Sequence, residues 1–277
     1  MNVQTPPPST VQAASLPPLA PRNYQGVNWE GLKTLYLREV RRFWKVGMQT
    51  VAAPVVTTLL YMMVFVVATA RARVGDVPFA QFVGPGLIMM SVLNNAFANS
   101  SSSLIQAKIM GTSPDFLTPP LSPSELAAGF SLGAATRGIV VGLVTAVAVW
   151  PFARFGVAAP WAVIYFTVVA SLMMAFVGVI TGLWAEKFDH LAAVTNFIVM
   201  PLTFLSGTFY SVDRLPEPFR SASHFNPFFY LIDGLRYGFI GRADGDLLVG
   251  VLATGALTLV LGGWCLILFR KGWRLKT

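Results

Sequence analysis

Charged residues are scarce in this chain. They make up 12% of its 277 residues, whereas 55% are hydrophobic and the mean hydropathy is +0.62. A soluble globular domain carries about 25% charged residues, so this chain has too few charges to cover a water-facing surface. Lipid must therefore be the solvent for much of the chain, and soluble enzyme chemistry is excluded.

Residue types that carry catalysis, metal binding and energy coupling are equally sparse. The single cysteine, Cys265, excludes a disulfide or a thiolate metal site within one chain. The two histidines, His190 and His224, are expected on opposite sides of a membrane and cannot share a metal. None of the 12 carboxylates falls clearly inside an apolar segment, where a proton relay or an intramembrane hydrolase needs one. No stretch matches the phosphate loop G-x-x-x-x-G-K-[ST], so ATP is not bound by that device.

The net charge of +8 does not indicate nucleic acid as a partner. Basic residues stand beside apolar segments, where they set topology and meet anionic lipid. Residues 1–26 are rich in proline and lack the basic-then-apolar pattern of a signal peptide. We expect them to form a disordered tail.

Residues 27–46 show the pattern of an interfacial amphipathic helix. Apolar residues from Trp29 to Phe43 recur every three or four positions. Basic residues cover much of the remaining surface: Lys33, Arg38, Arg41, Arg42 and Lys45. This predicts a helix in the lipid headgroups with its basic face toward the cytoplasm. The alternative is a solvated helix that packs on another domain.

Six apolar segments follow, each near the length that crosses a hydrocarbon core. They lie at about 48–70, 79–100, 129–152, 159–184, 191–210 and 247–269. More Lys and Arg fall on the inside if both termini are cytoplasmic. The predicted fold is an all-α integral membrane protein of six transmembrane helices, with both termini in the cytoplasm.

Residues 211–246, between the fifth and sixth segments, are too polar to span and too aromatic for a plain loop. Asp233 and Arg236 stand three apart, which predicts an ion pair on one helical face. Aromatic residues such as Phe228 and Tyr237 suit the headgroup level. We expect a re-entrant helical element on the outer side that shapes the exit of a pathway. The alternative is an interfacial anchor.

Two further features, one in a cytoplasmic loop and one inside a span, are candidate functional sites. The loop at 107–129 holds four prolines around an apolar tip at Phe116, Leu117 and Leu121. A stiff loop with an exposed apolar tip suits docking into a partner's groove, and the alternative is an idle connector. Arg137 is the one ionisable residue well inside a span. It either lines a pathway or snorkels to the interface.

Three stretches resemble the ABC-2 type permeases, in particular the bacterial YadH-like branch related to nodulation lipo-oligosaccharide export permeases. The stretches are FVGPGLIMMSVLNNAFANSSSSLIQAK (82–108), PLTFLSGTFYSVDRLPEPFR (201–220) and HFNPFFYLIDGLRYGFIG (224–241). The resemblance covers about residues 30–275 and includes the order and spacing of the motifs.

The resemblance implies a permease subunit of an ATP-binding-cassette exporter in the bacterial inner membrane. Residues 47–277 would be its transmembrane domain. It would work as a homodimer with two separate ATPase subunits, which bind ATP and Mg, so this chain would carry no cofactor or metal and would not be an enzyme. The coupling segment that fits the ATPase would contain Gly111, Thr112, Asp115, Phe116, Leu117 and Leu121. This stretch, GTSPDFLTPPLSP, carries less charge than is usual in the family.

Two alternatives stay open from the residues alone. A secondary carrier or channel, not coupled to ATP, would need polar groups along several spans. Asn94, Asn95 and Asn99 give such a stripe to one span only. A membrane enzyme acting on lipid is disfavoured by the missing acid–base cluster. Lipid-linked sugars, hydrophobic drugs and lipids fit equally well as cargo.

Overall fold

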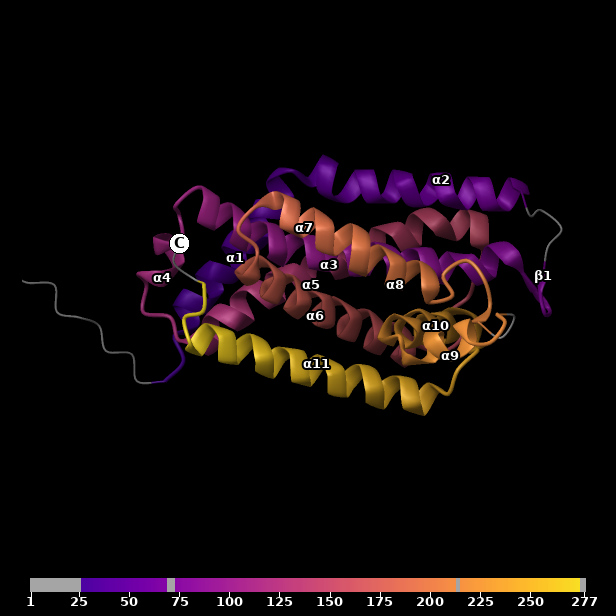
Figure 1. Cartoon of the computed structure of the whole chain (residues 1–277). Coiled ribbons are helices and arrows are strands. Elements are labelled where there is room, and N and C mark those ends of the chain that lie inside the picture. Colours follow the sequence, from indigo (N-terminus) through magenta and orange to yellow (C-terminus); the bar gives the residue numbers. More distant parts are fainter. Residues whose placement is uncertain (1–25, 69–72, 213–214, 275–277) are drawn as a thin grey trace, which may run out of the picture.

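The computed structural model describes residues 26–68, 73–212 and 215–274. Apart from Gly26, the predicted disordered tail lies outside the described residues. The described chain is a long bundle whose helices run roughly side by side (Figure 1). Helices α1 and α4 lie at one end of the bundle, and the β1 strand, α9 and α10 lie at the other (Figure 1).

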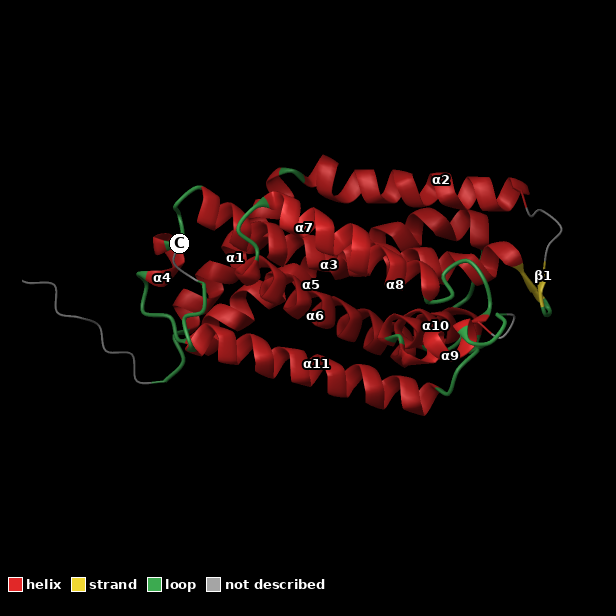
Figure 2. Ribbon diagram, in the orientation of Figure 1, coloured by secondary structure: helices red, strands yellow, loops and turns green. Residues whose placement is uncertain are grey.

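The described part of the chain is almost entirely helical, with one small hairpin (Figure 2). Helix α1 (Trp29–Lys45) leads through the π-helical turn η1 (Met48–Ala52) into α2 (Ala53–Ala68). Strands β1 (Arg73–Val74) and β2 (Val77–Pro78) then pair antiparallel, with Val74 opposite Val77. The elements that follow are α3 (Phe79–Ile109), α4 (Pro114–Leu117), α5 (Pro123–Ala153), α6 (Pro160–Trp184), α7 (Phe188–Val194), the π-helical turn η2 (Thr195–Val199), α8 (Met200–Leu205), α9 (Phe219–Phe225), α10 (Pro227–Ile240) and α11 (Leu247–Arg270).

Among the described residues, five helical segments are long and apolar enough to cross a membrane. They are Met48–Ala68, Pro123–Ala153, Pro160–Trp184, Phe188–Leu205 and Leu247–Arg270. Five of the six predicted spans therefore have a counterpart, and the chain is a mostly helical membrane protein. The predicted segment 79–100 forms most of α3, but α3 is not among these five because its run of asparagine and serine lowers its hydropathy.

Helix α3 lies at the centre of the bundle, packed along α5 and α6. Most of its residues are buried, so protein surrounds its polar side chains where lipid would otherwise meet them. Small residues allow the close approach: a Cβ added at Gly178 of α6 would overlap Ser100 and the Phe97 carbonyl. Ser100 Oγ donates to the Ala175 carbonyl oxygen of α6 at 2.9 Å. Small residues and interhelical hydrogen bonds are the usual means of helix packing in membranes.

The helices differ strongly in how much of their surface the chain itself covers. In the most apolar stretch of α5 and of α6, 44% of residues are buried. In the η1–α2, α7–α8 and α11 segments the share is 17%. These three lateral segments therefore present broad apolar faces to lipid or to another chain.

Candidate functional site

A single carboxylate fixes the starts of α1 and α5. Glu125 Oε2 accepts the Ser122 backbone N–H at 2.7 Å, while Ser122 Oγ accepts from Glu125, which completes a capping box. Glu125 Oε1 also accepts the backbone N–H of Asn28 at 2.6 Å, and the Asn28 side chain caps α1. Sequence reasoning missed this role, although the Ser-x-x-Glu pattern at 122–125 is its signature. Because α5 starts at Pro123, six residues before the predicted start at 129, Arg137 lies deeper in its helix than predicted.

Helix α1 packs lengthwise on α5 of the same chain. Leu35 and Glu39 face glycines of α5, because a Cβ at Gly129 or Gly133 would overlap them. Glu39 is fully buried, and the sequence analysis did not predict a role for it. Of the predicted basic residues, three are exposed and two are partly buried: Lys33, Arg41 and Lys45 point outward, and Arg38 and Arg42 face the protein.

The loop after α3 differs from the predicted exposed apolar tip. Phe116 is buried, with its ring 5.2 Å from Phe130 of α5 and the Arg38 guanidinium 5.6 Å from its centroid. Leu117 and Leu121 are half-buried. The expectation that Phe116 is an exposed docking residue was wrong, because its ring packs under α1 instead.

Beside this loop, Ile109 and Met110 are exposed apolar side chains, at 53% and 65%. They end α3, next to Gly111, whose φ of +67° turns the chain toward α4. Asp115 is exposed and Thr112 is half-buried on the same turn. The signal that could have found the pair is their place at the exposed end of a helix, just before a glycine.

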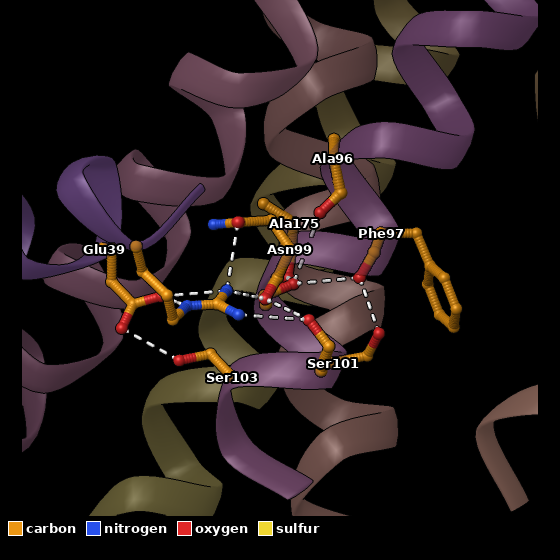
Figure 3. Close-up of polar contacts among 10 residues, drawn as sticks. Glu39, Ala96, Phe97, Asn99, Ser101, Ser103 and Ala175 are labelled. Carbon is orange, nitrogen blue, oxygen red and sulfur yellow. Dashed lines mark hydrogen bonds and ion pairs between the residues drawn. The ribbon is translucent and has the colours of Figure 1, made fainter. Parts of the chain in front are cut away.

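Glu39 and Arg42 tie α1 to the polar run of α3. Ser103 Oγ donates to Glu39 Oε1 at 2.8 Å (Figure 3). Arg42 Nη2 lies 3.4 Å from Glu39 Oε2 and donates to Asn99 Oδ1 at 3.0 Å and to the Asn99 carbonyl oxygen at 2.6 Å. Arg42 Nη1 donates to Ser102 Oγ at 3.3 Å. Through the buried Glu39 and the partly buried Arg42, α1 is therefore hydrogen-bonded to the polar run of α3.

Arg137 faces the same polar helix from α5. Its Nη2 donates to Asn95 Oδ1 at 3.0 Å, and its Nε is buried without a hydrogen-bond partner among the described residues. The sequence left open whether Arg137 lines a pathway or snorkels. In the structure its guanidinium is held against α3, beside the asparagine stripe.

A groove runs along that stripe, between α2 and α8 with α3 as its floor. Its volume is about 430 Å³. Its lining mixes apolar and uncharged polar side chains: Gln49, Ala53, Pro54, Thr57, Thr58, Tyr61, Leu87, Met90, Ser91, Asn94, Asn95 and Met200. Such a lining suits an amphiphilic molecule better than a small ion.

At the other end of the bundle, the predicted pair of Asp233 and Arg236 is confirmed. Arg236 Nη1 donates to Asp233 Oδ1 at 3.2 Å, and Arg236 is only 1% exposed. Its remaining donors reach the carbonyl oxygens of Phe82 (3.3 Å) and Gly207 (2.7 Å). The Asp233 carboxylate accepts backbone N–H groups of Asp244 and Gly245. Burial raises the pKa of the Asp233 carboxyl, and Arg236 and these backbone donors oppose that rise.

This ion pair joins the start of α3, the end of α8 and the turn before α11. Two predicted aromatic residues take different positions around it. Phe228 is buried in the core and not at a headgroup surface, so its predicted belt position was wrong. Tyr237 is half-buried, with its ring 6.4 Å from that of Trp161.

Fold and site together define a class of protein: a multi-pass α-helical membrane protein with a buried polar seam and no group of three or more His, Cys, Asp or Glu residues among the described positions that could hold a metal. The profile of the ABC-2 type transporter family matches residues 30–240. The chain belongs to this family. It is the permease subunit of an ABC transporter and not an enzyme, because the family carries no nucleotide-binding domain itself. An ATPase partner is implied.

Curated relatives agree with this assignment. The chain is 37% identical over 253 residues to the inner membrane transport permease YadH of Escherichia coli (strain K12), a match that covers 89% of this chain and 98% of the relative. It is 26% identical over 204 residues to nodulation protein J of Sinorhizobium fredii (strain NBRC 101917 / NGR234), covering 71% of this chain and 75% of that protein.

Proposed function

We propose that two copies of this permease form a translocation pathway in the bacterial inner membrane, driven by two separate ATPase subunits that bind ATP and Mg. The observation that carries the proposal is the structure of one bundle end, where α1, the end of α3 and α4 come together. This end holds basic α1, the exposed Ile109 and Met110 and the turn at Gly111. It supplies an apolar contact beside positive charge, which suits docking to a soluble protein.

The docking surface consists of Ile109, Met110, Gly111, Thr112 and Asp115. Phe116, Leu117 and Leu121 support it from below by packing against α1 and α5. Arg38 connects α1 to these supporting residues, because its guanidinium lies over the Phe116 ring. A displacement of this turn would therefore be transmitted directly to α1.

Helix α3 is the sixth span in this proposal. Its 31 residues exceed the roughly 20 that cross a bilayer. Its polar side chains are kept away from lipid because α5 and α6 enclose them. With six spans both termini share one side, and the exposed Lys33, Arg41 and Lys45 favour the cytoplasmic side for α1. The short helices α9 and α10 then form a re-entrant element on the outer side.

The second copy would cover the lateral face made by η1–α2 and α7–α8. These two segments are poorly covered within the chain, and they flank the polar groove. Both contain a π-helical turn, a feature found often at functional sites. Two such grooves facing each other would make a path with polar walls.

Docking is tested by co-purifying the ATPase with single variants. Met110→Asp should reduce the ATPase recovered, because it puts a charge into an apolar contact. Phe225→Asp is the matched control, since Phe225 is 89% exposed at the opposite end and should leave recovery unchanged. Recovery of the ATPase at wild-type yield with Met110→Asp would sink the proposed surface, and so would an equal loss in both variants.

Sidedness is tested by labelling introduced cysteines in intact cells. The native Cys265 is buried in α11, so background labelling should be low. Lys33→Cys should react only after the membrane is opened, and Phe225→Cys should react from outside. The reverse pattern would invert the proposed topology.

A further inference from the structure

The junction of α1, α3 and α5 holds more positive than negative charge. Two guanidinium groups, those of Arg42 and Arg137, face the polar run of α3, and one carboxylate, that of Glu39, accompanies them. Glu39 pairs with Arg42 at 3.4 Å. Arg137 has no ion pair among the described residues and a single acceptor, the neutral Asn95 side chain.

Unused donors lie at this same junction. Arg137 Nε is buried without a partner in the described part of the chain. Asn99, which is 0% exposed, uses its Oδ1 for Arg42 and leaves its Nδ2 without a partner. Buried donors are normally satisfied, and an exception requires an explanation. Here the missing group is an acceptor with negative charge.

A second copy of the chain offers few groups of this kind. The lateral segments that would face it, η1–α2 and α7–α8, carry one carboxylate, Asp189, in the first turn of α7. The other described deep carboxylates are committed: Glu125 caps two helices, and Asp233 holds Arg236. A bound molecule therefore accounts for the acceptor better than a second copy does.

The groove offers such a molecule a place beside the junction. Asn95, the partner of Arg137, lines the groove, and so does its neighbour Asn94. Ser91, Leu87 and Tyr61 follow toward the other end. An acyl or similar apolar chain would lie against Leu87, Met90 and Met200, which are apolar residues of the same lining.

We propose that Arg137, with Asn95 and Asn99, binds the anionic headgroup, a phosphate or carboxylate, of an amphiphile whose apolar part lies in the groove. A guanidinium is well suited to such oxygens because of its planar set of donors. The headgroup belongs either to an acidic membrane lipid or to the cargo. Only the case in which the headgroup belongs to the cargo rests on the proposed function.

The test measures lipid preference of the purified permease alone. Phosphatidylglycerol and phosphatidylcholine with the same acyl chains are titrated against wild type, Arg137→Gln, Arg137→Lys and Arg41→Gln. Binding is followed by native mass spectrometry and by thermal unfolding. Arg41→Gln is the matched control, since it removes one exposed positive charge from α1.

Wild type should prefer phosphatidylglycerol, and Arg137→Gln should weaken its binding by about tenfold, the loss expected for one charge-assisted contact. Arg137→Lys should keep part of the preference, and Arg41→Gln should lose only the small, salt-screened part that one exposed charge contributes, clearly less than Arg137→Gln loses. In phosphatidylcholine alone, Arg137→Gln should be as stable as wild type or more so, which a merely structural arginine would not allow. An unchanged preference in Arg137→Gln, or an equal loss in Arg41→Gln, would overturn the proposal.

The source of the headgroup is distinguished in proteoliposomes that contain the permease with its ATPase. ATP-dependent movement of fluorescent phosphatidylglycerol that is lost in Arg137→Gln identifies cargo. Bound phosphatidylglycerol that does not move identifies a resident lipid at the same site. If no complex with an ATPase forms, the proposed function fails while the binding measurement on the permease stands unaffected.

Discussion

Two arginines inside the bundle, Arg236 and Arg137, stand in contrasting environments. Arg236 gives each guanidinium nitrogen an acceptor: Asp233, the Phe82 carbonyl and the Gly207 carbonyl. Its guanidinium carbon also lies 3.8 Å from the Phe82 ring centroid. Arg137 has one neutral acceptor, Asn95, and its Nε has no hydrogen-bond partner in the part of the chain that the structure describes. A buried charge with all its partners holds elements together, whereas one that lacks partners indicates a site that something else completes.

The largest effect should come from breaking the satisfied pair. Asp233→Ala leaves the Arg236 charge buried and unpaired, which should cost about 3–5 kcal/mol of unfolding free energy. Thermal unfolding followed by tryptophan fluorescence measures the loss. Asp189→Ala, which removes an exposed acid, is the control. Equal stability of the two variants would show that the pair is not a structural lock.

A charge swap at this pair should not restore stability. With Arg at 233 and Asp at 236, a guanidinium would meet the backbone N–H groups of Asp244 and Gly245, and a carboxylate would meet two carbonyl oxygens. The double variant should therefore be no more stable than Asp233→Ala. Recovery to wild-type stability would mean that the backbone partners contribute little.

The α1 end contains a comparable apolar anchor. Phe116→Ala should cost about 3 kcal/mol, because the ring fills space between Phe130 and α1. Thermal unfolding should show the loss without any ATPase present. Met110→Ala is the comparison, and it should leave stability unchanged because Met110 is exposed. Equal behaviour of the two would remove the distinction between the supporting core and the docking surface.

The close contact between α3 and α6 should be destabilised by the addition of a single methyl group. Gly178→Ala should cost about 1–3 kcal/mol, since its Cβ would meet Ser100 and the Phe97 carbonyl of α3. Gly263→Ala in α11 meets nothing within 4 Å and serves as the helical glycine control. If both are equally tolerated, α3 and α6 separate more easily than their packing indicates.

The smallest effect belongs to the exposed basic face of α1. Arg41→Gln should weaken attraction to anionic lipid by up to about 1 kcal/mol. The measurement is binding of a peptide spanning residues 27–46 to acidic vesicles, at two salt concentrations. The difference should shrink at high salt because exposed charges are screened. An effect that salt leaves unchanged would place Arg41 in a buried contact.

Much of the fold could be predicted from the sequence because periodicity and length report directly on helices in lipid. The α1 pattern and five of the predicted spans follow from those two signals. The spacing of Asp233 and Arg236 likewise fixed their pairing. The burial of Glu39 and Phe116 could not be predicted, because Gly133 and Phe130 of α5, which they contact, come close to them only in the folded bundle.

The remaining features of the site could not be predicted from one segment at a time, because they too depend on contacts between segments that are far apart in the sequence. A carboxylate such as Glu125 can cap two helices only when they meet in space. The unpartnered nitrogen of Arg137 becomes visible only once every neighbour of α3 is in place. The run of asparagine and serine pointed to a polar span, but its position at the centre of the bundle comes from the small residues of α6.

The most direct measurement compares Arg236→Gln and Arg137→Gln by thermal unfolding in phosphatidylcholine. We predict that Arg236→Gln lowers the unfolding temperature strongly, because Asp233 loses its partner, while Arg137→Gln leaves it unchanged or raises it. Adding phosphatidylglycerol should then stabilise wild type and Arg236→Gln but not Arg137→Gln. If Arg137→Gln in phosphatidylcholine unfolds as early as Arg236→Gln, Arg137 is a structural residue like Arg236 and the contrast between them is wrong.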